Sequence, residues 1–252
     1  MSRLQGKKAI VTGGGQGLGR AISEELMRLG CDVAIHYYKS AEGSQQVKQC
    51  APASVRAECF AADLTIESEA SAMVDAAVEF LGGLDVVVNN SGDIIARRRL
   101  GEVDSEFWKR VMDVNVTSMM LVTRQALSYL QGSENSSVVN IASLAGRMGG
   151  HAGSLVYATA KGAVLTWTRS LAKELGPQGI RVNAVAPGLI LGTAFHATHT
   201  TPESAAKTVA GIPLGRAGNP EDVARAVAFF ASEYDGFITG ATLDINGGVF
   251  GC

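Results

Sequence analysis

A tyrosine and a lysine four positions apart, Tyr157 and Lys161, have the clearest capacity for chemistry in this sequence. They begin residues 157–175, whose apolar spacing predicts a helix. Side chains four apart lie on one helix face, so the phenol and the ammonium can share one site. A tyrosine ordinarily titrates near pH ~10. A fixed positive charge favours the phenolate, so we expect Lys161 to lower the pKa of Tyr157 toward a range useful for proton transfer.

Ser143 supplies a second polar group, because it follows the apolar run of residues 136–143. Its hydroxyl can hydrogen-bond a substrate carbonyl or hydroxyl oxygen from another direction. Taken singly, these residues also fit plainer interpretations. A tyrosine–lysine pair arises by chance on helix surfaces, and Ser143 fits an ordinary loop residue or a helix cap. The elements that position them must decide between these interpretations.

A glycine-rich turn follows the first apolar run and contains Gly13, Gly17 and Gly19. The spacing departs from GxGxxG, but the glycines can serve the same purposes. Gly13 permits a tight turn, Gly17 lets a pyrophosphate approach the backbone, and Gly19 lets the next helix pack closely. The N-terminus of that helix would then face the phosphates. A plain strand–helix turn is the alternative, but the position at the first strand–helix junction favours nucleotide binding.

Short apolar runs alternate with helical patterns along the whole chain. The runs that predict strands are residues 7–13, 31–38, 54–64, 84–92, 136–143, 180–188 and 240–247. The patterns that predict helices are residues 17–30, 40–50, 66–83, 103–130, 157–175, 201–210 and 219–232. This alternation predicts an α/β protein: a single-domain, Rossmann-like doubly wound fold over residues 1–252, with a seven-stranded parallel sheet flanked by helices on both faces.

Composition excludes several classes of function. The formal net charge is −2, which gives no basis for binding nucleic acid. No apolar stretch approaches the length of a membrane span, and no apolar signal core precedes the first strand. The four cysteines have no metal-binding spacing, so we expect reduced thiols, no metal site and a cytoplasmic location.

The motifs follow one another in a characteristic order. TGxxxGxG from Thr12, NNSG from Asn89, then Ser143, YxxxK from Tyr157 and PG at Pro187 span essentially the whole chain. In this the sequence resembles the short-chain dehydrogenase/reductase family.

The resemblance implies a role for each catalytic position. Tyr157 would be the general acid/base, Lys161 would tune it and bind the cofactor ribose, and Ser143 would orient the substrate oxygen. Asn115 matches the position that holds a proton-relay water, although it also fits a satisfied polar residue in a helix kink. Ser143 and Tyr157 are 14 positions apart, one more than the commonest family spacing, and the loop between them can absorb the extra residue.

The resemblance also implies a nicotinamide cofactor. The position that is Asp in NAD-preferring relatives is Tyr37, and no carboxylate lies near it in the sequence. Lys39 can pair with a ribose phosphate and His36 can assist it, whereas Gln16 is neutral where many NADP enzymes carry Arg or Lys. We therefore expect NADP(H) to be preferred, with NAD(H) left open; a solvated Lys39 is the alternative.

Further cofactor contacts follow from the family pattern. Asp63 would hold the adenine amine, Asn89 and Gly92 would cover the adenosine ribose, and the stretch from Pro187 would surround the nicotinamide carboxamide. The remaining expected contacts are Leu18, Tyr38, Leu64, Gly188, Ile190 and Thr193.

The substrate is less well defined by the sequence. The chain is most similar to β-ketoacyl-[acyl-carrier-protein] reductases, but sugar and polyol dehydrogenases share every motif used here. A catalytically silent nucleotide-binding regulator is a further alternative. We expect residues 189–215, with Phe195, His196 and His199, to form a lid rather than a metal site.

Two features concern partners. The basic residues 97–99 follow the fourth strand and could meet a phosphate or an acidic carrier protein, or be a solvated cluster; the turn before the fifth strand has no Lys or Arg. Relatives of this kind are mostly homotetramers built on their two longest helices, here residues 103–130 and 157–175, and we expect the same assembly.

Overall fold

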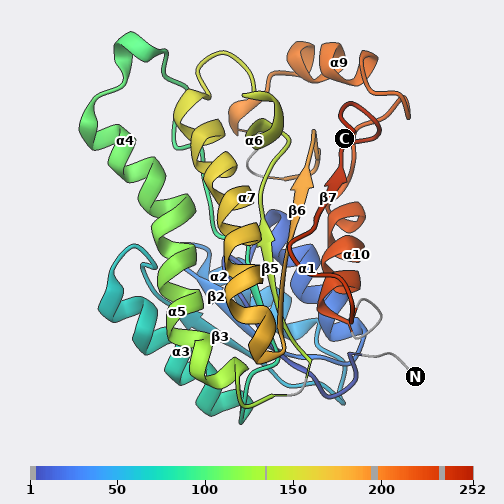
Figure 1. The fold of residues 1–252 in the computed structure, drawn as a ribbon. Coiled ribbons are helices and arrows are strands. Elements are labelled where there is room, and N and C mark those ends of the chain that lie inside the picture. The colour runs from blue at the N-terminus through green and yellow to red at the C-terminus, as the bar shows by residue number, and fades with distance from the viewer. Residues whose placement is uncertain (1–3, 134, 194–197, 233–235, 252) are drawn as a thin grey trace.

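The computed structural model describes residues 4–133, 135–193, 198–232 and 236–251. At its centre is one parallel sheet with the strand order β3-β2-β1-β4-β5-β6-β7 (Figure 1). The strands are β1 (Lys8–Val11), β2 (Asp32–Tyr37), β3 (Ala57–Ala61), β4 (Val86–Asn89), β5 (Ser136–Ile141), β6 (Ile180–Pro187) and β7 (Thr242–Ile245). All seven predicted strands are therefore present, and the doubly wound α/β fold is confirmed.

Helices connect consecutive strands. They are α1 (Gly17–Arg28), α2 (Ala41–Gln49), α3 (Glu67–Leu81), α4 (Ser105–Met112), α5 (Ser118–Leu130), α6 (Ala145–Met148), α7 (Leu155–Leu175), α9 (Pro202–Ala210) and α10 (Pro220–Ala231). Short 3₁₀ turns are η1 (Leu100–Glu102) and η3 (Gly176–Gln178), and η2 (Asp113–Thr117) is a π-helical turn. Pro202 and Pro220 lie at the first helical positions of α9 and α10, where proline is favoured because its missing N–H has no partner in the helix.

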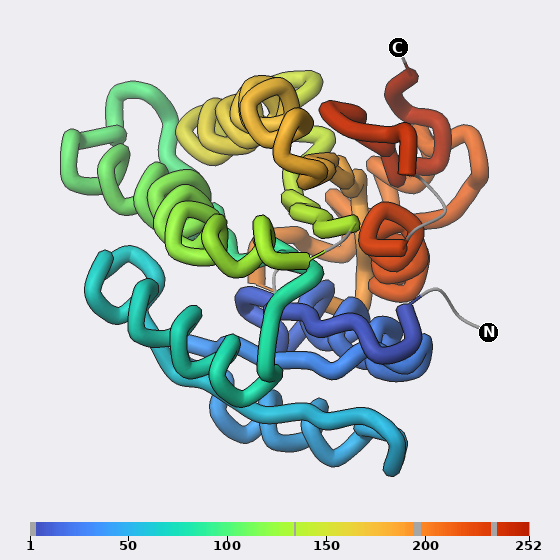
Figure 2. Tube along the Cα trace, turned by 60° about the horizontal axis from the view of Figure 1, so that its bottom comes forward, coloured from blue at the N-terminus to red at the C-terminus, as the bar shows by residue number. Residues whose placement is uncertain are grey.

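The two faces of the sheet carry separate cores because successive strand side chains point to opposite sides. Val11 and Val139 pack with α1, α2 and α10, whereas Ile10 and Val138 pack with α3, α5 and α7. Figure 2 shows these two sets of helices on either side of the sheet. The strands therefore read as continuous apolar runs, as expected for strands buried on both faces.

One predicted helix is interrupted. Residues 103–130 form α4 and α5 with the π turn η2 between them. Asn115 lies in that turn, and its Nδ2 donates to the Val111 carbonyl at 2.9 Å and to the Asp93 carbonyl at 2.7 Å. The side chain thus competes for a carbonyl of the helical ladder, which is a physical cause of the bulge. Such turns occur frequently at functional sites.

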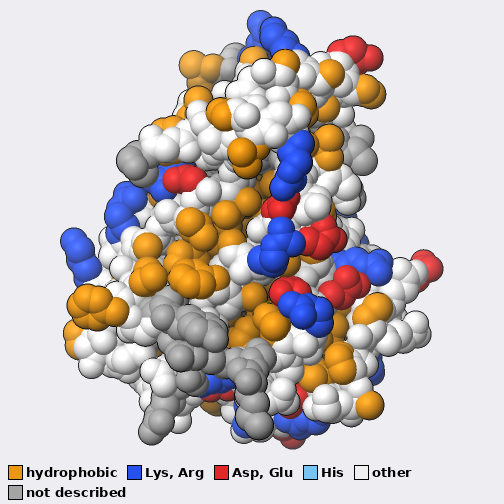
Figure 3. Space-filling model, turned by 90° about the vertical axis from the view of Figure 1, so that its right-hand side faces the viewer, with side chains coloured by type: hydrophobic (Ala, Val, Ile, Leu, Met, Phe, Trp, Pro, Cys, Tyr) orange, Lys and Arg blue, Asp and Glu red, His pale blue; other side chains and the backbone are white. Residues whose placement is uncertain are grey.

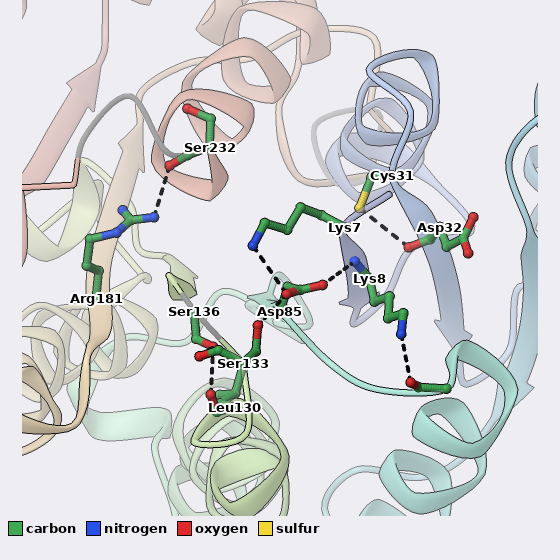
Figure 4. Close-up of polar contacts among 11 residues, drawn as sticks. Lys7, Lys8, Cys31, Asp32, Asp85, Leu130, Ser133, Ser136, Arg181 and Ser232 are labelled. Carbon is green, nitrogen blue, oxygen red and sulfur yellow. Dashed lines mark hydrogen bonds and ion pairs between the residues drawn. The ribbon is translucent and has the colours of Figure 1, made fainter. Parts of the chain in front are cut away.

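The amino ends of the strands are held by polar contacts around Asp85 (Figure 4). Asp85 accepts hydrogen bonds from the backbone N–H of Lys8 at 2.9 Å, from Lys7 Nζ at 3.3 Å and from the Ser133 hydroxyl. At the same edge, the Arg181 guanidinium donates to the Ser232 carbonyl at 3.0 Å. These contacts fix the sheet edge that faces away from the expected site.

The opposite edge is formed by the carboxyl ends of the strands. In Figure 1 the arrows of β6 and β7 point to this edge, where α6 and α9 lie. The strand order reverses between β1 and β4, and ligands bind at such a point in open α/β sheets. Among the described residues no helix is long and apolar enough to span a bilayer.

Candidate active site

A cavity of about 940 Å³ opens at the carboxyl edge of the sheet. Its wall combines the glycine turn, the ends of β2, β4, β5 and β6, the first turns of α7, and the segment that includes α9. It therefore joins most of the predicted cofactor residues to the predicted catalytic residues in one elongated space. Within the residues that the structure describes, no group of three or more His, Cys, Asp or Glu side chains could hold a metal ion.

Ser143, Tyr157 and Lys161 converge on this cavity. The Ser143 hydroxyl and the Tyr157 phenol form a hydrogen bond, and Ser143 Oγ also accepts the Ala145 N–H at 3.1 Å. Lys161 Nζ donates to the Ile141 carbonyl at 2.8 Å and lies 5.7 Å from the centre of the Tyr157 ring. Helix α7 thus presents the phenol and the ammonium on one face, beside the end of β5.

The pKa values differ from the expectation made above. Burial raises the pKa of Tyr157 to about 12, and the Ser143 hydrogen bond opposes that rise only in part. Burial also lowers the pKa of Lys161 to about 8. The predicted lowering of the Tyr157 pKa is therefore absent from the protein alone, because removal from water outweighs the Ser143 hydrogen bond and the Asp93 carboxylate raises the pKa further.

Asn115 stands behind the cavity wall rather than in it. Its Oδ1 is buried and, within the described part of the chain, has no hydrogen-bond partner. A Cβ added to Gly92 would lie 2.6 Å from this oxygen and 2.9 Å from Lys161 Nζ. An unpaired buried acceptor and an ammonium beside a glycine form a small cradle, which fits a water or a ligand hydroxyl.

The glycine turn has the backbone that the sequence predicts. Gly13 and Gly17 have φ angles of +62° and +53°, in the left-handed region that favours glycine. A Cβ on Gly19 would lie 2.0 Å from the Gly13 carbonyl oxygen, so α1 could not begin so close to the turn with any other residue. Gln16, Gly17 and Leu18 line the cavity at the N-terminus of α1. The turn therefore fits a phosphate group.

The adenosine end differs from the prediction in detail. Tyr38, Lys39 and Asp63 line the cavity, whereas Tyr37, Leu64 and Asn89 do not. The Leu64 side chain packs in the core against α3 and α5. Asn89 points into the interior, where its Nδ2 donates to Thr123 Oγ1 and to Asn140 Oδ1, each at 2.9 Å.

Neighbouring residues take these places in the cavity wall. They are Ser40, Thr65, Asn90 and Ser91. Asn90 Nδ2 donates to the Thr12 carbonyl at 2.9 Å and to the Gly13 carbonyl at 3.2 Å, so it braces the glycine turn. Because strand side chains alternate, an error of one position exchanges an interior residue for a cavity residue. The two consecutive asparagines in NNSG were the signal that either Asn89 or Asn90 could face the cavity.

His36 is not the cation that the sequence suggested. It is 2% exposed, and burial lowers its pKa to about 4. Both ring nitrogens are engaged, with the Gly13 N–H at 3.0 Å and the Ala62 carbonyl at 3.1 Å. A neutral imidazole whose two ring nitrogens are both hydrogen-bonded within the protein cannot attract a ribose phosphate.

The other end of the cavity is formed by loops. Pro187, Gly188, Ile190 and Thr193 line it, together with Thr200, Ser204, Thr208 and Ile212 from residues 189–215. Phe195 and His196 lie outside the described residues. The His151 side chain lines the cavity and is also exposed, and His199 Nε2 lies 3.7 Å from Asp93 Oδ1.

The predicted basic residues at 97–99 do not act as one cluster. Arg97 donates to the His199 carbonyl at 3.3 Å and so joins the loop after β4 to the lid segment. Arg98 pairs with Asp104 at 3.0 Å and lies 4.3 Å over the Phe107 ring. These arginines therefore hold loops in place.

A doubly wound parallel sheet, with a glycine turn at one end of its cavity and a serine–tyrosine–lysine group at the other, belongs to the class of dinucleotide-dependent oxidoreductases. Within that class, the chain belongs to the short-chain dehydrogenase/reductase family. A family model described as enoyl-(acyl carrier protein) reductase matches residues 13–250.

Individual relatives are named for different substrates. Glucose 1-dehydrogenase 2 of Bacillus subtilis is 37% identical over 98% of this chain and 95% of its own length. A 3-oxoacyl-[acyl-carrier-protein] reductase of Vibrio cholerae is 35% identical over 98% of each chain. These named relatives act as oxidoreductases, so this chain is an enzyme of the same kind and the silent-regulator alternative is disfavoured.

Solved structures agree on the fold and differ in cofactor. A short-chain dehydrogenase of Burkholderia cenocepacia in complex with NADP has a TM-score of 0.91 at 34% identity, covering 98% of this chain and 99% of that one. An NADH-dependent reductase responsible for alginate metabolism has a TM-score of 0.88 at 33% identity, with both chains fully covered. The family therefore establishes a nicotinamide dinucleotide, in either form.

Because Lys161 is buried as a cation, we expect its replacement by an apolar residue to stabilise the protein. Its pKa in the folded protein, about 8, lies below the ordinary 10.5, so below pH 8 both folded and unfolded chains carry the proton and the folded chain bears the whole penalty. The penalty disappears as the pH rises from about 8 toward 10.5. We expect Lys161→Met to raise the free energy of unfolding at pH 7 by about 1–2 kcal/mol, after allowing for the lost bond to Ile141.

Urea denaturation at pH 7 and pH ~10 measures this effect, which should shrink at the higher pH. Lys173→Met is the matched control, because Lys173 is exposed on the same helix. A Lys161→Met protein that is less stable than the native protein by the same amount at both pH values would contradict the prediction.

Proposed function

We propose that this enzyme is an NADP(H)-dependent reductase that converts a carbonyl group to a secondary alcohol, with 3-oxoacyl thioesters as its substrate class. The observation that carries the proposal is the hydrogen-bonded Ser143–Tyr157 pair, which lines the same cavity as the glycine turn. A dinucleotide extended along that cavity would reach from the turn to the phenol.

The proposed roles follow from the contacts. A bound nicotinamide supplies the hydride that the carbonyl carbon takes up. Ser143 donates a hydrogen bond to the carbonyl oxygen, and Tyr157 gives that oxygen its proton. With a pKa of about 12, the phenol is fully protonated near neutral pH and can protonate the more basic alkoxide that develops. Lys161 and Ser143 then stabilise the phenolate, and Asn115 Oδ1 accepts from a water that returns the proton.

The proposed preference for NADP(H) depends on Lys39. Its ammonium lies 5.0 Å from the centre of the Tyr38 ring, and both residues line the cavity beside Ser40. The nearest carboxylate of that part of the wall, Asp63, has its Oδ1 engaged by the N–H and hydroxyl of Thr65. A cation and a hydroxyl at the end of β2 favour a ribose phosphate over a free ribose hydroxyl.

Sugar or polyol dehydrogenation is the second candidate. A carrier protein is acidic and needs free cations at the cavity mouth. Arg97 and Arg98 are instead occupied by the His199 carbonyl and Asp104. This observation favours a small free substrate, as does the similarity to a glucose dehydrogenase.

The first experiment measures NADPH oxidation with acetoacetyl thioesters, beside NADP⁺ reduction with glucose and a polyol panel. We expect turnover with the thioesters, and Tyr157→Phe should lower kcat at least about 100-fold, because the proton donor is removed while the cavity keeps its shape. Cofactor binding should change little.

Tyr129→Phe is the matched control, since Tyr129 lies on α5 outside the cavity wall and its hydroxyl donates to Asp75. Activity with sugars and none with thioesters would replace the first substrate class by the second. Full activity in Tyr157→Phe would refute the mechanism.

The cofactor preference predicts the effect of Lys39→Ala. Loss of the cation beside Tyr38 in the cavity wall should lower kcat/KM for NADPH about tenfold and leave kcat/KM for NADH nearly unchanged. Lys48→Ala, at the end of α2 and paired with Glu58, serves as the control. A native enzyme that prefers NADH tenfold would overturn the assignment.

We also propose that the enzyme is a homotetramer. Trp108 on α4 and Leu155 on α7 are 42% and 45% exposed, and they belong to the two longest helical segments. Hydrophobic side chains also gather on the side of the molecule shown in Figure 3. Phe229 on α10 and Leu243 on β7 are exposed as well. Two apolar faces on different sides of a chain suit an assembly with two kinds of interface.

Light scattering should therefore give the mass of four chains at micromolar concentration. Phe229→Glu should reduce the assembly to dimers, because it places a charge in one interface only. Ile66→Glu is the control, since Ile66 is exposed at the start of α3. A native protein that is monomeric under these conditions contradicts the proposal.

A further inference from the structure

His36 occupies a structural position that no catalytic or binding role explains so far. It is the fifth residue of β2, pairs in register with Phe60 of β3, and is almost fully buried. Its ring lies between the glycine turn and the end of β3, with one edge against the cavity wall. It therefore connects the proposed phosphate-binding turn to the sheet.

The two contacts of the ring define its protonation. A backbone N–H can only donate, so Nδ1, which receives the Gly13 N–H at 3.0 Å, must carry no proton. A carbonyl can only accept, so Nε2, 3.1 Å from the Ala62 oxygen, must carry one. One neutral tautomer satisfies both contacts. The low pKa of the ring agrees with this.

His36 also acts through its main chain. Its carbonyl accepts the Gly14 N–H at 2.8 Å, so one residue of β2 receives two consecutive N–H groups of the turn. The opposite side of Gly13 is held by Asn90, which donates to its carbonyl at 3.2 Å. The Gly13 residue is therefore fixed at both its N–H and its C=O.

The orientation of Gly13 determines where α1 begins. Its carbonyl oxygen lies 2.0 Å from the position that a Cβ on Gly19 would take, so the glycine turn and the first turn of α1 pack closely against each other. The first backbone hydrogen bond of α1 runs from Arg20 N to Gln16 O. The N–H groups of Gly17, Leu18 and Gly19 thus precede the helical ladder and are the donors that a phosphate can receive.

We propose that His36 is a positioning residue for the dinucleotide: its Nδ1 fixes the Gly13 amide and thereby the turn that receives the pyrophosphate. This rests on the proposed function, since it assumes that the turn binds a dinucleotide. Two other roles make different predictions. A merely structural histidine would matter for stability alone, and a cationic histidine would bind the ribose phosphate of NADPH directly.

Two substitutions separate the two ring nitrogens. The amide of Asn reaches about as far as Nδ1, so His36→Asn keeps an acceptor for Gly13 and loses the Ala62 contact. The amide of Gln reaches about as far as Nε2, so His36→Gln keeps a donor for Ala62 and leaves the Gly13 N–H without its acceptor. Each variant loses one hydrogen bond of similar type, so their losses of stability should be similar.

The expected result is a difference in cofactor binding. In fluorescence titrations of the full chain, His36→Gln should raise the dissociation constant for NADPH about tenfold, whereas His36→Asn should stay within about threefold of the native protein. The KM for NADPH should follow the same order. At saturating cofactor, kcat should stay within about twofold in both variants, because the catalytic residues are not displaced.

Equal weakening in both variants, or a loss of stability without a difference in cofactor affinity, would overturn the proposal. Loss of NADPH affinity with unchanged NADH affinity would instead identify a direct phosphate contact, which also overturns it. If the native protein binds neither dinucleotide, the proposed function itself fails. Native binding with an unaffected His36→Gln variant refutes the positioning role alone.

A measurement on the native protein covers the case in which a variant does not fold. The ¹⁵N chemical shifts of the His36 ring at pH 7, assigned through its backbone, report which nitrogen carries the proton. The proposal requires the proton on Nε2, and a proton on Nδ1 overturns it.

Discussion

The common direction of the seven strands is the constraint on which the rest of this enzyme depends. Because every connection returns antiparallel to the strands, the helix C-termini gather at one edge of the sheet and the N-termini at the other. At the first edge, Lys8 donates to the Gly82 carbonyl at 2.7 Å, Arg56 to the last carbonyls of α3, and Arg181 to the carbonyls of Phe230 and Ser232. Lysine and arginine side chains thus bind the carbonyls at the negative C-terminal ends of the helices. The positive N-terminal ends face the cavity, where they favour the phosphates of a dinucleotide.

Burial beside the same sheet makes two of the proposed catalytic side chains costly to the stability of the folded protein. Lys161 is 4% exposed and donates to one carbonyl, and Asn115 Oδ1 is buried without a partner among the described residues. Elsewhere in the core, polar side chains such as Asn140 and Thr168 bond one another. Asn115 Oδ1 and the Lys161 ammonium lie together beside Gly92, as expected where a protein gives up stability for a site that a ligand completes.

The sequence predicts the elements of this fold well and their details less well. Continuous apolar runs identify the seven strands because each strand is buried on both faces, and the periodicity of residues 157–175 places Tyr157 and Lys161 on one helix face. Asn89 and His36 are different cases. Successive side chains of a strand point to opposite faces, so whether each of these two side chains faces the cavity or the interior changes with a shift of one position. The apolar periodicity could not predict the π turn at Asn115 either, because the turn involves a contact to Asp93, 22 residues away.

The substrate end depends on contacts between loops that no local pattern encodes. Arg97 reaches the His199 carbonyl across 102 positions of the sequence, and the Arg98 N–H bonds the Gly153 carbonyl. Ser143, Tyr157 and Lys161, in contrast, lie within a helix or just after a strand end. The proposed chemistry thus rests on rigid elements, whereas loops form the proposed substrate end. Loops can vary while the fold is kept, which agrees with similarity both to a relative named for an acyl thioester and to one named for glucose.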